Sequence, residues 1–195
     1  VYHTYSNPGL YLPQVSLLSG TNGLCTITLK GLDTLRIDRV TAGFTYTLET
    51  VCDSTFLQVK DTSTAFSSIV QWNWNFGDLT TSVLPQPRHK YTSSGNFTVQ
   101  LTATSALGCT NSRSVVVPVK VYQTPVVDFS YTENVCLFDT LTYFANIQSA
   151  EPVSFTRWLV SNGVNVSGNS LRTVFTQPGA YSIALVAGTQ FGCYD

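Results

Sequence analysis

Residues 89–103 read HKYTSSGNFTVQLTA, and this stretch decides the fold. From Phe97 to Ala103 apolar and polar side chains alternate, which predicts a half-buried β-strand after a glycine turn. The pattern occurs again at 173–187 (TVFTQPGAYSIALVA) and at 3–17 (HTYSNPGLYLPQVSL). The aligned rings of Tyr5, Tyr91 and Phe175 are 86 and 84 residues apart. A repeat of this length predicts a tandem array of domains.

Further landmarks recur at about the same spacing: the stretch 44–46 with Cys52 matches 129–131 with Cys136, and Trp74 matches Trp158. We therefore expect the later part of a first repeat at 1–39, a complete repeat at 40–123, and a third repeat without its last strand at 124–195. The phase of the repeat also predicts that the sequence is a window of a longer protein.

Short alternating segments dominate the complete repeat, and no segment shows a helical period. We expect strands near residues 40–47, 55–62, 69–76, 80–84, 88–92, 96–104 and 112–121. Pro118 interrupts the last of these, which predicts an edge strand or a bulge. In the segment 69–76 the inward face should carry Val70, Trp72, Trp74 and Phe76. Seven short strands in one repeat predict an all-β protein of tandem immunoglobulin-like β-sandwiches.

Composition excludes some partners and favours a compartment. The 195 residues carry a formal net charge of -1, and 11% of them are charged, so no basic patch exists for nucleic acid. No apolar run is long enough for a membrane-spanning helix. The five cysteines form no CxxC pair and only two histidines are present, which argues against zinc. Widely spaced cysteines at repeated positions favour disulfides in an oxidising compartment. The alternative is buried free thiols.

A specific resemblance rests on residues 74–78 (Trp-Asn-Phe-Gly-Asp) and 87–91 (Pro-Arg-His-Lys-Tyr). They resemble the W-x-F-G-D and P-x-H-x-Y signature of PKD (polycystic kidney disease) domains. The structural motif comprises Trp74, Phe76, Gly77, Asp78, His89, Tyr91, Gly95 and Trp158. The third repeat departs from it, because residues 158–162 read Trp-Leu-Val-Ser-Asn. The cysteine-bearing variant resembles the tandem repeats of large bacterial surface proteins, such as gliding-motility adhesins of the SprB type exported by type IX secretion.

The resemblance implies a non-enzymatic, extracellular role at a bacterial cell surface. The chain would be a structural or adhesive stalk segment that projects an adhesive region and bears force. Its partners would be neighbouring repeats, and surface polysaccharide or other cell-surface proteins. The alternative is a carbohydrate- or protein-binding accessory module of a secreted enzyme. Several near-identical units favour the stalk, whereas binding by an isolated unit would favour the module.

No constellation of catalytic residues is visible. His3 and His89 occupy equivalent positions, but the third repeat has Val174 nearby, so we expect structural hydrogen bonds rather than acid–base chemistry. Asp78 is the single candidate metal ligand, for calcium. We favour instead that it caps backbone N–H groups in a turn. Its counterpart Asn162 would cap equally well and would weaken a cation site. We expect no cofactor.

Cysteine pairing can be argued in two ways. Cys52–Cys109 and Cys136–Cys193 have the same separation of 57 residues, which suggests bridges within each repeat. However, Cys52 follows the first strand and Cys109 precedes the last, at opposite ends of strands roughly 25–30 Å long. A disulfide needs Cα atoms within about 7 Å. Stacking of repeats would instead place Cys52 beside Cys193. We expect a Cys52–Cys193 bridge, with the same-repeat pairs as the alternative and with partners for Cys25, Cys109 and Cys136 outside the sequence.

Overall fold

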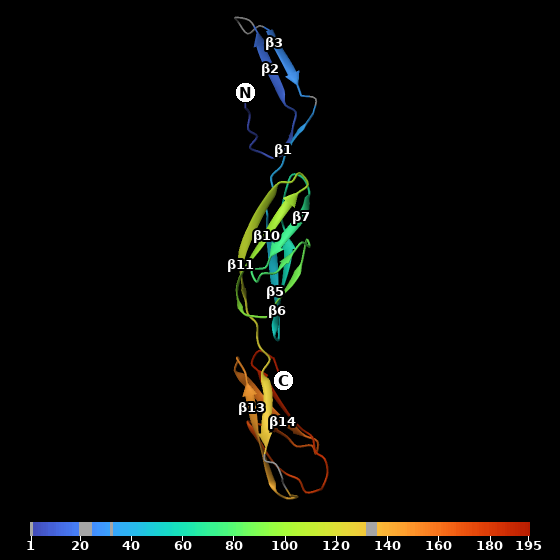
Figure 1. Ribbon diagram of the computed structural model, residues 1–195, viewed down its shortest axis with the longest axis vertical. Coiled ribbons are helices and arrows are strands. Elements are labelled where there is room, and N and C mark those ends of the chain that lie inside the picture. The colour runs from blue at the N-terminus through green and yellow to red at the C-terminus, as the bar shows by residue number, and fades with distance from the viewer. Residues whose placement is uncertain (1, 20–24, 32, 132–135) are drawn as a thin grey trace. The chain divides into compact units, whose positions relative to one another are not determined.

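The computed structural model describes residues 2–19, 25–31, 33–131 and 136–195 (Figure 1). Its regular elements in these ranges are all β-strands, so the described part of the chain contains no helix that could span a membrane. The chain forms two compact units. The first comprises Val1–Thr47, Leu57–His89 and Asn96–Pro118, and the second comprises Leu48–Phe56, Lys90–Gly95 and Val119–Asp195. The division into repeats at 39/40 and 123/124 stays a prediction.

Two strand pairs occupy the N-terminal part of the first unit. They are β1 (Gly9–Tyr11) with β4 (Leu35–Ile37), and β2 (Gln14–Ser19) with β3 (Cys25–Lys30). Both pairs are antiparallel. Arg39 joins this segment through its guanidinium Nη2, which donates to Ser6 O at 2.7 Å.

Two sheets form the middle of the chain. One has the order β11-β10-β7-β8 and the other β5-β6-β9. Their strands are β5 (Phe44–Val51), β6 (Ser54–Asp61), β7 (Ile69–Asn75), β8 (Thr81–Ser82), β9 (Arg88–Tyr91), β10 (Gly95–Ser105) and β11 (Thr110–Val119). Pro118 lies in β11, and β11 is an edge strand, as predicted. An edge strand tolerates proline because its outer N–H groups have no neighbouring strand to bond.

The core of this sandwich is built around Trp74. The indole is fully buried, lies opposite Leu101 in the register of β7 and β10, and meets the ring of Phe44 edge-on at 5.1 Å. Val99 and Leu57 are fully buried as well. The burial of Trp74 against β10 confirms the prediction from alternation, which follows from the two-residue period of a strand.

The predicted inward face of residues 69–76 is wrong at Val70. Its side chain is 54% exposed, whereas Ile69 packs against the small cluster of Val40 and Ala103. The cause is a register shift: Thr104 pairs with Gln71, but Ser105 pairs with Ile69. A bulge at this point turns Val70 to the other side, because one inserted residue inverts the alternation.

The C-terminal part of the second unit forms a further sandwich. Its sheets have the orders β12-β13-β16 and β15-β14-β17. The strands are β12 (Val126–Tyr131), β13 (Thr140–Gln148), β14 (Val153–Val160), β15 (Asn165–Ser167), β16 (Ser170–Val174) and β17 (Ile183–Thr189). Trp158 lies at the centre of its core with Leu141, Tyr143, Val160 and Leu171. The ring of Phe129 meets Trp158 at 5.5 Å, much as Phe44 meets Trp74.

Candidate functional site

The W-x-F-G-D motif begins in the last two residues of β7 and continues into the turn after it, and both of its aromatic side chains are buried. Trp74 Nε1 donates to Leu84 O at 2.9 Å, so the one polar atom of the buried ring has a partner. Phe76 is buried too, and its ring stacks on the imidazole of His89. Tyr91, at the end of β9, is almost completely buried. These residues serve the core, and they do not form the exposed aromatic surface that a glycan would need.

Two features of the backbone require glycine at position 77: a positive φ and close contact with a neighbouring strand. The φ of Gly77 is +83°, a region that side chains rarely adopt. A Cβ atom added there would lie 2.8 Å from both the N and the O of Thr98. The turn therefore approaches the backbone of β10 too closely for any other residue.

Asp78 is fixed by three interactions. Thr80 donates its N–H and its hydroxyl to Asp78 Oδ1 at 3.1 and 2.6 Å, and His89 Nε2 lies 2.7 Å from Asp78 Oδ2. Burial raises the pKa of Asp78, but the hydrogen bonds from Thr80 and His89 together outweigh it and hold the pKa below its ordinary value. The carboxylate thus joins the turn to β9.

The sequence favoured capping over calcium for Asp78, and capping is what its oxygens do here. Within the described ranges, no group of three or more His, Cys, Asp or Glu side chains could hold a metal ion. His89 makes the expected structural contact through Asp78. His3 instead lies edge-on to the ring of Tyr5, with centroids 4.5 Å apart.

The C-terminal sandwich has a similar tryptophan anchor and a similar cap. Trp158 Nε1 donates to Gly168 O at 2.9 Å, and Val164 N donates to Asn162 Oδ1 at 3.2 Å. Asn162 therefore caps its turn as expected from its correspondence to Asp78. Val174 stands near the position that corresponds to His89, so the Asp78–His89 pair has no equivalent at Asn162 and Val174.

The structure contains the expected Cys52–Cys193 disulfide, with Cα atoms 5.5 Å apart. Cys109 and Cys136 are free thiols, so the alternative pairs Cys52–Cys109 and Cys136–Cys193 are wrong. The reason is topological: Cys52 lies between β5 and β6, whereas Cys109 lies between β10 and β11. The side chain of Cys25 lies outside those described.

A set of hydrogen bonds surrounds the disulfide, all within the second compact unit. Asp53, which adopts a φ of 63°, accepts from Thr124 N at 2.8 Å and from Thr124 Oγ1 at 2.6 Å. Asp53 N in turn donates to Tyr122 O at 2.8 Å. The hydroxyl of Thr124 holds the pKa of Asp53 below its ordinary value, and its N–H adds to this effect. Ser94 Oγ accepts from Val121 N at 2.8 Å.

Aromatic and ionic contacts complete this junction, which we define as residues 52–55, 94, 119–124 and 189–193. The rings of Tyr122 and Phe191 are stacked with centroids 3.9 Å apart. Lys120 lies over the Tyr122 ring at 5.6 Å and pairs with Glu151 at 3.5 Å. The sequence did not predict these contacts. A usable signal was the pattern of an aromatic residue, glycine and cysteine at 191–193.

Comparison with known proteins agrees with the motif. Residues 41–121 match the family model described as PKD domain. Collagenase ColA of Bacillus cereus is 39% identical over 74 residues, which is 37% of this chain and 8% of that protein. The chain thus spans less than a tenth of the collagenase's length.

Two solved structures are also similar. The PKD1 domain of Vibrio anguillarum Epp is 29% identical, with a TM-score of 0.37, and the match covers 42% of this chain and 94% of that one. The PKD1 domain of Vibrio cholerae metalloprotease PrtV is 28% identical, with a TM-score of 0.36, and the match covers 41% of this chain and 95% of that one.

Proposed function

We propose that this chain is a non-catalytic, extracellular accessory region whose β-sandwiches fix and space the domains beside them. The observation that carries the proposal is the junction. A disulfide, the Asp53–Thr124 cap and the Ser94–Val121 hydrogen bond all lie at residues 120–124, which connect β11 to β12, or beside them. A disulfide also fits an oxidising compartment outside the cell. No residue of the junction has the arrangement of a nucleophile beside a base.

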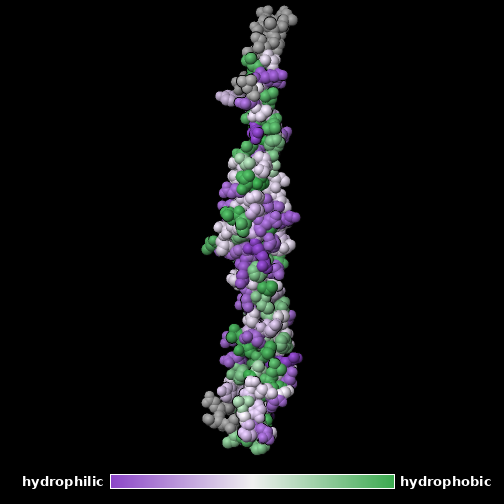
Figure 2. All heavy atoms as spheres, turned by 90° about the vertical axis from the view of Figure 1, so that its right-hand side faces the viewer, coloured by the Kyte–Doolittle hydropathy of each residue, from purple (hydrophilic) through white to green (hydrophobic). Residues whose placement is uncertain are grey.

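The PKD-domain match and the likeness to a collagenase favour an accessory region of a secreted enzyme over a stalk. In that role the chain would contact the polysaccharide or protein on which the enzyme acts. Figure 2 shows polar and apolar residues mixed in small groups over the face it presents. Such a surface suits broad, weak contact with a polymer.

The adhesin stalk is the second candidate. It is favoured by the recurrence of the tryptophan anchor at Trp74 and Trp158, each of which donates to a carbonyl ten residues later. A recurring unit with a fixed junction suits a spacer that holds an adhesive region away from a cell surface. Gliding motility and type IX secretion belong to this candidate and rest on the sequence resemblance.

Binding separates the two candidates. The purified oxidised chain is incubated with collagen fibrils and with insoluble polysaccharides, and the bound fraction is measured by sedimentation. Retention on one polymer supports the accessory module. A folded chain that binds none of them favours the spacer. Hydrolysis of a peptide, ester or glycoside that disappears in His89→Ala would contradict both candidates.

A further inference from the structure

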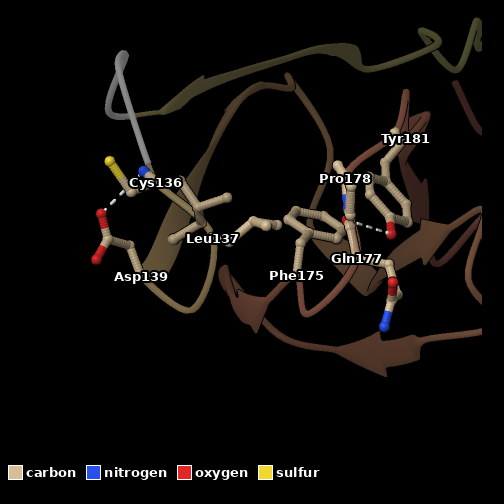
Figure 3. Close-up of a pocket in the computed structure, with 9 residues that line it drawn as sticks. Cys136, Leu137, Asp139, Phe175, Gln177, Pro178 and Tyr181 are labelled. Atoms are coloured by element: carbon tan, nitrogen blue, oxygen red, sulfur yellow. Dashed lines mark hydrogen bonds between the residues drawn. The ribbon is translucent and has the colours of Figure 1, made fainter.

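The turn before β13 carries an exposed free thiol, Cys136, at one side of a cavity of about 210 Å³. Figure 3 shows Leu137 between Cys136 and the ring of Phe175, with Asp139 near Cys136 and Tyr181 on the other side of Phe175. Tyr181 stacks on Phe175, and its hydroxyl donates to Gln177 O. The cavity therefore has an aromatic wall and an exposed thiol at its edge.

This cavity corresponds to a surface that is occupied elsewhere in the same chain. Subtracting 84 from Cys136, Leu141 and Phe175 gives Cys52, Leu57 and Tyr91. Around Cys52 the equivalent surface is covered: Cys193 is bonded to Cys52, Thr124 is capped by Asp53, and Ser94 holds Val121. At Cys136, which is exposed, no other segment among the described residues covers the same turn.

The uncovered surface is more apolar than its covered counterpart. Leu137 and Pro178 stand where the middle repeat has Asp53 and Ser94. Leu137 and Phe138 are 43% and 69% exposed. A partner at this place would lack the two side-chain contacts that hold residues 121–124, because Leu137 and Pro178 replace Asp53 and Ser94.

The turn that covers Cys52 is itself a recurring element. At 189–193, Thr189 N donates to Cys193 O at 2.8 Å and Gly192 has a φ of +83°. At 105–109, Ser105 N donates to Cys109 O at 2.9 Å and Gly108 has a φ of +81°. Each turn places an apolar residue, Phe191 or Leu107, two positions before its cysteine. Each cysteine Sγ also lies near the carbonyl of the residue 71 positions earlier, at 3.7 and 3.9 Å.

We propose that Cys136 and its cavity form the docking site for an apolar-Gly-Cys turn of another repeat of this kind, joined by a disulfide equivalent to Cys52–Cys193. The inference goes beyond the proposed function and shares with it only the oxidising surroundings. A small disulfide such as oxidised glutathione is the oxidant. The thiolate of one cysteine displaces glutathione from it, and the second thiolate then displaces the other glutathione. The oxidant gains two electrons, and the two protons from the cysteines leave with the released thiols.

The test extends the whole chain by one repeat in register. Residues 112–195 are appended after Asp195, so that the second copies of Cys136 and Cys193 follow at the same period. The extended chain is oxidised with glutathione, alkylated, and mapped by mass spectrometry without reduction. We expect Cys136 to lose its alkylation and to appear linked to the second copy of Cys193. The matched control carries Cys136→Ser and should leave that copy alkylated. The original Cys52–Cys193 bridge reports correct oxidation in both chains.

The proposal is overturned by one outcome. In it, the Cys52–Cys193 bridge forms and the appended repeat folds, but Cys136 stays alkylated or forms intermolecular dimers. Folding of the appended repeat is read from protection of its Trp158 copy against a fluorescence quencher.

If that repeat does not fold, a second assay decides. A peptide copy of residues 186–195, activated as a pyridyl disulfide, is offered to the chain with Cys25→Ser and Cys109→Ser. Cys136 should release pyridine-2-thione about tenfold faster than with a Phe191→Ser peptide. Equal rates reject the docking site.

Discussion

The ring of Phe76 lies parallel to the imidazole of His89, with centroids 4.2 Å apart and 5° between the planes. The same imidazole contacts Asp78 through Nε2 at 2.7 Å. His89, which lies on β9, thus holds both Phe76 and Asp78 of the W-x-F-G-D motif, by apolar contact on its face and by a hydrogen bond at its edge. This geometry explains the spacing of the motif, because the turn must bring Phe76 and Asp78 to the ring of His89 on β9.

The two contributions of His89 can be separated by substitution. His89→Phe should keep the ring stack and lose the hydrogen bond, whereas His89→Ala loses both. We expect His89→Ala to lower the free energy of unfolding by about 0.5–1.5 kcal/mol more than His89→Phe, the usual size of an aromatic pair. Urea denaturation of both variants measures the difference. Equal losses would show that the stack adds nothing.

Trp74→Ala should cost roughly 3–5 kcal/mol of stability, the range for a large ring removed from a core. Trp72→Ala is the matched control. Trp72 is only half-buried and donates to Asp61 Oδ2 at 2.7 Å from the margin of the core. Its loss should cost clearly less. Thermal and urea unfolding of the two variants compare them, and a Trp72→Ala cost as large as that of Trp74→Ala would contradict this account of the core.

The variants Gly77→Ala and Gly108→Ala separate the cost of backbone strain from the cost of a steric clash. Both glycines have φ near +80°, so alanine is strained at either position. An added Cβ at Gly77 meets the backbone of Thr98, whereas at Gly108 it meets no atom within 4 Å. We expect Gly108→Ala to cost about 1 kcal/mol and Gly77→Ala at least twice that. Denaturation curves that coincide for the two variants would show that the turn can move away from β10.

Asp53 should make the junction sensitive to strong acid. Its pKa is lowered in the folded chain, so its stabilising effect is complete above the ordinary value of 3.8 and is lost as the pH falls through the lower folded value. Asp53→Asn should therefore be less stable than the parent chain at pH 7, and the difference should shrink below about pH 4. Thr124→Val removes the hydroxyl donor and should reproduce part of the effect. A difference that stays constant down to pH 2 would refute this linkage.

Reduction should weaken the second unit. The Cys52–Cys193 bridge closes a long loop, and loss of such a constraint typically costs about 2–5 kcal/mol. Cys52→Ser should show the same loss as reduction and should be insensitive to added dithiothreitol. A reduced parent chain with an unchanged denaturation midpoint would show that the hydrogen bonds alone hold residues 119–124.

Strand positions were predictable because alternation reports which face of a strand is buried. Trp74 and Val99 follow this rule, and Val70 breaks it where a bulge intervenes. The disulfide was predictable from chain topology, since Cys52 and Cys109 lie at opposite ends of their strands. The cap of Asp53 on Thr124 was not predictable. It depends on a positive φ at Asp53 and on the docking of a segment 71 residues away, and neither leaves a local pattern.

The bridge between Cys52 and Cys193 has a separate consequence for the extracellular role proposed above, because proteases outside the cell attack exposed loops. The two cysteines are 141 residues apart, and most of the second unit lies between them. A single cut anywhere in that interval leaves both fragments covalently attached. The chain can thus be nicked at an exposed turn, such as the one that carries Phe138, without shedding its C-terminal fragment.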